Sequence, residues 1–397
     1  MKKVFQKINK SLFTEAFFCM LFSFVVLGVV TLIGLNLSFF TPFNNAFKDF
    51  SYLDLYYAEK LDENSGVINQ NIILVNIDRL NRKEISFLLD KLENQKPSVL
   101  GVDVIFKEEK NRVEDSALAR SHEIESLVTT YTITNDDLIR TSNEIAKRNQ
   151  PSGYSNFSFD PETLVVRNFQ GLRKDGDSLQ VSFGVAVAKE FLKNDWTNKL
   201  EKYLQKERPI NYKGNRENFL ILENEDIMGQ DTLPIVKDKI VLLGYLGNAQ
   251  THEFDIEDKH FTPMNDKFVG KSAPDTFGLV VHANIVNMII TSDFISVVPN
   301  WLLVLLTILV TYLGLAYFIW LGKRGLVSYA MRLKIIRLVF ILLMIWMALV
   351  LFRNGVLFKT AGIIAVSFFS ISLLGYYKKL AHMLHKKLKW NGYFYQE

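Results

Sequence analysis

The chain has 397 residues, of which 49% are hydrophobic and 22% are charged. This length and composition exclude an intrinsically disordered protein and a small disulfide-stabilised scaffold. The net charge is only +4, but the signs are separated: residues 41–298 hold 30 basic and 40 acidic residues, whereas the remainder holds 16 basic residues and two acidic ones, Glu15 and Glu397. Because this remainder also holds the long apolar segments, an ordinary cytosolic enzyme is excluded.

Four apolar segments predict transmembrane helices, at residues 16–40, 299–321, 335–352 and 355–377. A helix rises about 1.5 Å per residue, so about 20 apolar residues cross a hydrocarbon core of about 30 Å. The first segment exceeds the apolar core of a secretory leader, and we expect a retained anchor. A weak cleavage site at residues 44–46 keeps a cleaved leader open as the alternative. The only cysteine, Cys19, lies in this segment, so residues 41–298 contain no disulfide.

Lys and Arg near the ends of these segments predict the orientation in the membrane. Short loops rich in these residues stay in the cytoplasm. The basic segments are residues 1–15, 322–334 and 378–397. We therefore expect both termini in the cytoplasm, residues 353–355 at an external tip, and residues 41–298 wholly outside.

The external block begins with alternating strand and helix patterns. Residues 71–77 and 98–106 are short apolar, β-branched runs typical of buried strands, and residues 85–92 between them have helical spacing. Strand, helix and strand in this order predict a βαβ unit in a parallel sheet that helices cover on both faces. A third strand is expected at residues 128–133.

Later segments extend the same fold class. We expect strands at residues 164–169 and 238–244, and helices at residues 181–192 and 280–291. The sequence therefore predicts one α/β domain with a mainly parallel or mixed sheet covered by helices, together with four transmembrane helices.

Several motifs resemble, in order, those of the CHASE2 family of bacterial extracytoplasmic sensor domains. They are NIILVNIDRLNRKEISFLLDKLENQKPSVLGVDVIF at residues 71–106, INYKG at 210–214, KIVLLGYLG at 239–247, Thr262-Pro263, and GLVVHANIVNMII at 278–290. The resemblance implies one anchor, the sensor domain and three further spans, in the cytoplasmic membrane of a bacterium. It also implies that an Asp before Thr-Pro, here Asp255 or Asp258, holds its loop in place.

Two features depart from the family pattern. The loop after the first strand is shortened, and only Arg82 can stand for the arginine that the family usually carries there. CHASE2 proteins commonly continue into a cyclase, kinase or phosphodiesterase module, whereas this chain stops at Glu397, twenty residues after Tyr377. We therefore expect the output of the sensor to lie in a separate protein.

Candidate ligand-contacting residues follow the predicted strands, because ligands of open α/β sheets bind outside the carboxyl ends of the strands. Asp78 follows the first strand, and residues 245–260 follow the last strong strand. Asp103 lies within an otherwise apolar run, where a carboxylate needs a partner or a raised pKa. The simpler reading is that Asp103 is a buried structural residue bonded to backbone or to Arg82. The alternative is a ligand-contacting group of Asp78, Arg82 and Asp103.

The loop at residues 251–260 holds two histidines and four carboxylates, among them Asp255, Asp258 and His260. Such donors can hold Zn²⁺ or Ca²⁺, but their spacing matches no known metal motif. We favour a solvated loop with one structural aspartate and expect no metal and no cofactor. His282 and Asn284 open the last predicted helix, where a structural role is favoured over ligand binding or pH sensing.

The sequence favours a non-enzymatic sensor or receptor subunit that takes an unknown extracytoplasmic ligand and signals to an unidentified protein. It holds neither a nucleophile elbow nor a phosphate-binding loop. The alternative is a structural scaffold of an envelope complex. An enzyme would need metal in the 251–260 loop, and a transporter is disfavoured because the predicted spans lack carboxylates. A homodimer is plausible.

The C-terminal segment interleaves lysines with aromatic residues, as at Lys389 and Trp390. This pattern occurs in nucleic-acid-binding segments, but it is also typical of helices that lie against anionic lipid headgroups. Because it directly follows a predicted span, we expect membrane lipid and not nucleic acid as its partner.

Overall fold

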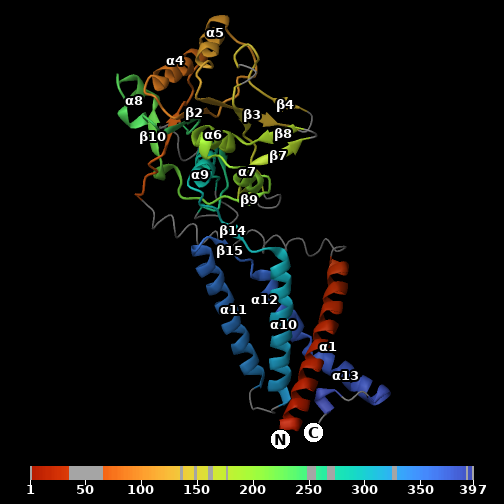
Figure 1. Ribbon diagram of the computed structural model, residues 1–397. Coiled ribbons are helices and arrows are strands. Elements are labelled where there is room, and N and C mark those ends of the chain that lie inside the picture. The colour runs from red at the N-terminus through yellow and green to blue at the C-terminus, as the bar shows by residue number, and fades with distance from the viewer. Residues whose placement is uncertain are drawn as a thin grey trace. The chain divides into compact units, whose positions relative to one another are not determined.

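The computed structural model describes residues 2–34, 66–134, 137–146, 150–159, 164–175, 178–247, 256–265, 273–323, 329–389 and 392–395. The chain divides into two compact units (Figure 1). One comprises Met1–Asn44 with Ser296–Glu397, and the other comprises Asn45–Ile295. The two units are described separately.

The Asn45–Ile295 unit is built on a mixed sheet with the strand order β10-β1-β11-β2-β3-β4, in which β5 also pairs with β3. All pairs are parallel except β3 with β4. The strands are β1 (Ile72–Asn76), β2 (Val99–Val102), β3 (Leu127–Ile133), β4 (Leu138–Ile139), β5 (Ser152–Tyr154), β10 (Leu220–Glu223) and β11 (Ile240–Gly244). The prediction of an α/β fold with a mixed sheet is confirmed.

Helices cover both faces of this sheet, which explains why its central strands are apolar at almost every position. Ile73 and Val75 of β1 belong to one core cluster, which includes residues of α4 (Arg82–Glu93), α5 (Arg112–Ser121) and α8 (Asn224–Met228). Ile72 and Leu74 belong to another cluster, with α6 (Phe183–Leu192) and α9 (Gly278–Ile290). Successive side chains of a strand point to opposite faces, so each face of β1 packs against a different helical layer (Figure 1).

The βαβ unit predicted for residues 71–106 is present, but its two strands are not neighbours in the sheet. β1 and β2 are parallel and joined by α4, as predicted, but β11 lies between them and pairs with both. All five positions of β11 are buried. A long connection therefore brings a strand from late in the chain into the middle of the sheet.

The backbone of α6 approaches the sheet closely at Gly153. A Cβ atom added to Gly153, in β5, would lie 2.5 Å from the Cα atom of Phe183, at the start of α6. A side chain at this position would therefore collide with backbone, and only glycine fits.

Shorter elements surround this core, and one predicted strand is largely absent. Of residues 164–169, only Asn168–Phe169 forms a strand, β6, which pairs with β9. The remaining strands are β7 (Leu172–Asp175), β8 (Ser178–Val181), β9 (Arg208–Pro209), β12 (Lys259–His260) and β13 (Thr276–Phe277). The other helices are α7 (Asn198–Leu204) and the 3₁₀ turns η2 (Lys193–Asp195), η3 (Arg216–Asn218) and η4 (Pro234–Val236).

The other unit is helical. Three of its described helices are long and apolar enough to cross a membrane: α1 (Lys2–Gly34), α10 (Asn300–Lys323) and α11 (Tyr329–Arg353). A fourth span is possible if α12 (Ala361–Ser372) and α13 (Leu374–Leu388), which meet at a 44° bend, act together. The fourth helix begins later than predicted, because Val356–Leu357 forms a strand, β15, that pairs with β14 (Ser296–Val297).

A buried carboxylate corrects the expectation that the spans contain none. The apolar part of α1 begins at Ser11, so it includes Glu15, whose side chain is 3% exposed. Glu15 accepts hydrogen bonds from the Tyr377 hydroxyl at 2.7 Å and from the backbone N–H of Tyr393 at 2.8 Å. Tyr393 opens a 3₁₀ turn, η5 (Tyr393–Tyr395), so Glu15 joins α1 to α13 and to the C-terminal segment.

Candidate functional site

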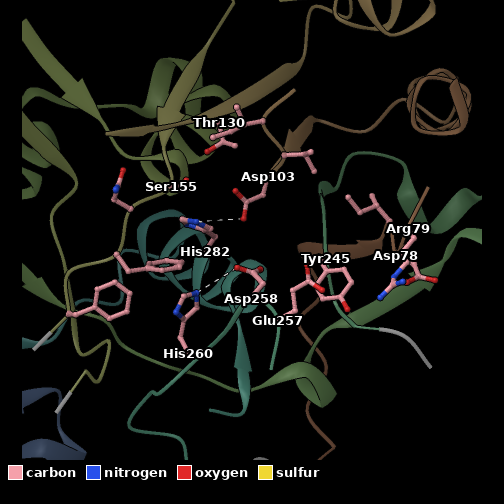
Figure 2. Close-up of a pocket in the computed structure, with 16 residues that line it drawn as sticks. Asp78, Arg79, Asp103, Thr130, Ser155, Tyr245, Glu257, Asp258, His260 and His282 are labelled. Carbon is pink, nitrogen blue, oxygen red and sulfur yellow. Dashed lines mark ion pairs between the residues drawn. The ribbon is translucent and has the colours of Figure 1, made fainter. Parts of the chain in front are cut away.

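A cavity of about 610 Å³ lies at the carboxyl ends of the central strands (Figure 2). Its lining includes Asp78 beyond the end of β1, Asp103 directly after β2, and Tyr245 directly after β11. The loop after β5 contributes Phe157, and α9 contributes His282. The parallel sheet thus places the residues that follow its strands around one cavity, where ligands of such sheets bind.

Asp103 and His282 face one another in this cavity (Figure 2). The Oδ2 atom of Asp103 lies 3.8 Å from the Nε2 atom of His282, beyond hydrogen-bond distance. The His282 side chain is 3% exposed, and neither ring nitrogen has a hydrogen-bond partner among the residues that the structure describes. Its ring packs against Phe157 and Phe183, with centroid distances of 4.6 and 5.1 Å.

Burial shifts the pKa values of both residues, and in each case the shift favours the uncharged form. Burial, together with the smaller effect of the nearby negative charge of Asp258, raises the pKa of the Asp103 carboxyl to about 7. Burial lowers the pKa of His282 to about 3, and His260 adds to the shift. At neutral pH His282 is therefore uncharged, and its contact with Asp103 is not an ion pair.

Asp258 holds the neighbouring loop against the start of α9. Its backbone carbonyl accepts a hydrogen bond from Gly278 N–H at 2.9 Å. A Cβ atom at Gly278 would lie 3.0 Å from each carboxylate oxygen of Asp258, so glycine permits this close approach. The N-terminus of a helix also favours a negative charge. The resemblance implied that Asp255 or Asp258 holds this loop; of the two, Asp258 lies in the described part of the chain and makes these contacts.

His260, on β12, lies beside Asp258, with 3.7 Å between its Nε2 atom and the Oδ1 atom of Asp258. Its ring packs against Phe157 at 4.9 Å and Phe159 at 5.7 Å between centroids. Phe157 thus contacts the rings of both His260 and His282. Asp255 lies outside the described residues.

Arg82 does not lie beside Asp103, which corrects that expectation. α4 begins at Arg82, and the guanidinium forms a buried ion pair with Asp115 of α5 and donates to the Glu108 carbonyl. The hydrogen bond from Arg82 holds the pKa of Asp115 below its ordinary value. Arg82 therefore joins two helices, whereas Arg79 lines the cavity.

Asn284 also lies away from the cavity lining. Its side chain is fully buried and accepts a hydrogen bond from Lys213 N–H at 2.8 Å. It donates to the carbonyls of Gly214 and Val280, each at 2.9 Å. Asn284 thus anchors the INYKG segment on α9. This helix begins at Gly278, so His282 and Asn284 lie within it and do not open it.

The aromatic wall of the cavity was not expected from the sequence. Phe157 and Phe159 follow β5, a three-residue strand with no hydrophobic period that could reveal it. Tyr245 and Glu257 belong to the segment after β11, where lining residues were expected, although neither was singled out.

The described residues contain no group of three or more His, Cys, Asp or Glu side chains that could hold a metal ion. Residues 251–255 of the acidic loop lie outside the part of the chain that the structure describes. The expectation of a solvated loop without metal therefore remains a prediction.

Comparison with known proteins supports the resemblance seen in the sequence. The model of the CHASE2 domain family matches residues 25–316, which is more than half of the chain. No curated protein matches the chain. No solved structure matches it either. The family match includes the sheet, the cavity residues and parts of α1 and α10, and the chain therefore belongs to the CHASE2 family.

Proposed function

We propose that this protein is a non-enzymatic membrane sensor that binds a small extracytoplasmic molecule in the cavity beside Asp103 and His282 and signals to a separate protein. The observation that carries the proposal is the cavity itself. Its volume of about 610 Å³ is in the range of small-molecule sites. It is lined by a buried imidazole, that of His282, whose two nitrogens have no hydrogen-bond partner in the described part of the chain. Unpaired buried polar groups are costly, and a ligand would satisfy them.

Membership of the CHASE2 family supports the sensory role, because CHASE2 is a family of sensor domains. The apolar helices support a membrane location. The basic segments beside them favour an orientation with both termini in the cytoplasm and residues 41–298 outside the cytoplasmic membrane. In this orientation the basic, amphipathic α13 lies near anionic lipid headgroups.

Signal transfer would start at α9. His282 lies on this helix, and the chain continues from Ile290 through β14 to α10, which begins at Asn300. A ligand shifts a conformational equilibrium only by the difference between its binding free energies for the two states. If α9 takes two positions, a ligand that contacts His282 binds them with different free energies and therefore shifts the equilibrium between them.

Copurification tests this proposal. The full-length tagged protein is isolated from native membranes, with or without the low-molecular-mass fraction of spent growth medium, and the amount of bound partner is compared. We expect the fraction to change the amount of partner. The Ser155→Trp variant, which fills the cavity, should abolish the change, whereas Lys199→Trp, on exposed α7, should preserve it.

A partner that stays bound in equal amounts under all these conditions would support the alternative, a structural scaffold of an envelope complex. In that case the cavity would have no role in partner binding, and the sensor proposal would be wrong.

A further inference from the structure

The cavity lining is predominantly acidic. Its described residues include four carboxylates, those of Asp78, Asp103, Glu257 and Asp258. Among the described lining residues, Arg79 is the only Lys or Arg, and His282 is neutral at pH 7 because burial lowers its pKa. A ligand with a net negative charge would therefore meet repulsion, whereas a cation would be attracted.

Aromatic rings form another part of the same wall. Phe157, Phe159 and Tyr245 line the cavity together with the two imidazoles. Figure 2 shows Tyr245 on the side nearer Asp78 and Arg79, with His260 and His282 elsewhere around the cavity. The faces of aromatic rings attract cations, and their carbon surfaces favour an apolar ligand body.

The Asp103 and His282 pair offers a specific place for one charged nitrogen. A hydrogen bond to nitrogen is about 2.9 Å long, so atoms separated by less than twice this distance can both contact one donor. Asp103 Oδ2 and His282 Nε2 are 3.8 Å apart and meet this condition. A neutral imidazole has one acceptor nitrogen, and in His282 no described residue donates a hydrogen bond to it. An ammonium group has three donors.

We propose that the cavity binds a small organic cation, in which a protonated amine contacts Asp103 and His282 and an apolar body lies against Phe157 and Tyr245. This inference rests on the proposed function and specifies the class of its ligand. The size of the cavity and its aromatic wall favour an organic molecule over a bare metal ion. The described residues also contain no cluster of three or more His, Cys, Asp or Glu side chains that could hold a metal ion.

The affinity of this site depends on pH through Asp103. Its carboxyl has a pKa of about 7 and faces His282 and the like-charged Asp258. A bound ammonium favours the ionised carboxylate and so promotes release of its proton. Alkylamines, like lysine, remain protonated in this range, so the affinity rises about tenfold between about pH 6 and pH 8.

Thermal unfolding of the full-length protein in detergent tests the ligand class. The probes are phenethylamine, cadaverine and agmatine, compared with neutral 2-phenylethanol, anionic 3-phenylpropionate and Zn²⁺. At about ten times its Kd, a bound amine should raise Tm by about 3–5 °C, and the neutral and anionic probes should not. The amine effect should be larger at pH 8 than at pH 6.

Variants that replace one carboxylate by an amide of similar shape locate the site of amine binding. Asp103→Asn and Asp258→Asn should each reduce the amine-induced shift by more than half. Asn tolerates the left-handed backbone of Asp258, where φ is 55°. Asp231→Asn removes one charge at an exposed position outside the cavity lining and should leave the shift unchanged.

The outcomes separate this inference from the proposed function. Stabilisation by the neutral or anionic probe, or by Zn²⁺ alone, would overturn the organic-cation class and leave a ligand-binding sensor in place. A shift that persists in Asp103→Asn and Asp258→Asn would overturn the site. Failure of all three amines to raise Tm would overturn the cation class, and only the copurification experiment decides the sensor proposal.

Discussion

Asp103 and His282 lie 3.8 Å apart, and burial disfavours the charged form of each. An aspartate and a histidine this close could stabilise one another as ions. The depth of the cavity instead keeps His282 neutral and places the titration of Asp103 near neutral pH. A nearby positive charge or a small change in pH would therefore change the fraction of Asp103 that is ionised.

Replacing Asp103 should remove a pH-dependent cost of folding. The folded-state pKa is raised from 3.8 to about 7, so the protein loses stability as the pH rises through this window. The loss amounts to about 1.4 kcal/mol between about pH 6 and pH 8. We expect Asp103→Asn to melt higher than wild type at pH 8, with a smaller difference at pH 6. Melting curves across this range check the prediction, and an equal difference at both values would contradict it.

His282 should impose the opposite dependence on acid. Its pKa is lowered from 6.5 to about 3, so the unfolded chain takes up a proton that the folded chain refuses. Stability is lost as the pH falls below 6.5, by up to about 1.4 kcal/mol per pH unit. His282→Phe and His282→Leu should therefore gain stability relative to wild type between pH 6.5 and pH 5. If neither variant becomes more stable relative to wild type over this pH range, His282 is not buried in its neutral form.

The sequence predicted the strongest elements and the location of the cavity but not the neighbours of each strand. β1, β2 and β11 are all buried apolar runs, and such runs do not specify which strand pairs with which. The insertion of β11 between β1 and β2 was therefore missed. Arg82 was a candidate partner of Asp103 because it alone can stand for the arginine of the family pattern, but α4 begins at this residue and its guanidinium pairs with Asp115 of α5.

The aromatic wall was missed for a different reason. β5 has three residues, and its position depends on the close approach of Gly153 to the backbone of Phe183. Such a contact between segments distant in sequence leaves no periodic pattern, so Phe157 could not be assigned to the cavity. Asp103 and His282 could be named as candidates because a titratable side chain inside an apolar segment is visible in the sequence alone, although the sequence favoured a structural role for both.

The Arg82 and Asp115 ion pair should stabilise the packing of α4 against α5. Lysine cannot reproduce the planar guanidinium that contacts both Asp115 and the Glu108 carbonyl. We expect Arg82→Lys to lower Tm at pH 7, whereas Arg79→Lys, at the cavity, should have little effect.

The same pair predicts a dependence on acid. The pKa of Asp115 is lowered, so its contribution is present above its ordinary value of 3.8 and is lost as the pH falls through the lowered value. The difference in Tm between wild type and Arg82→Lys should therefore shrink in acid. A difference that grows in acid would contradict this role for Asp115.

Gly153→Ala should be strongly destabilising. The added methyl group would lie 2.5 Å from the backbone of Phe183, which cannot move without displacing α6. Overpacking of this kind costs about 1–3 kcal/mol or more. Gly362→Ala is a suitable control, because no heavy atom of the described residues, apart from its chain neighbours and the backbone of its own helix, lies within 4 Å of the added carbon. Equal melting temperatures of the two variants would show that α6 does not pack on β5 as described.

The sidedness of the cavity-bearing unit is the central claim, and labelling of an introduced cysteine in intact cells tests it most directly. Cys19 is fully buried, whereas Val113 and Leu388 are 71% and 72% exposed, so Val113→Cys and Leu388→Cys give a matched pair with little background. A membrane-impermeant maleimide should label Val113→Cys in intact cells and Leu388→Cys only after lysis. Labelling of Leu388→Cys in intact cells, with Val113→Cys protected until lysis, would place the cavity in the cytoplasm and contradict the account.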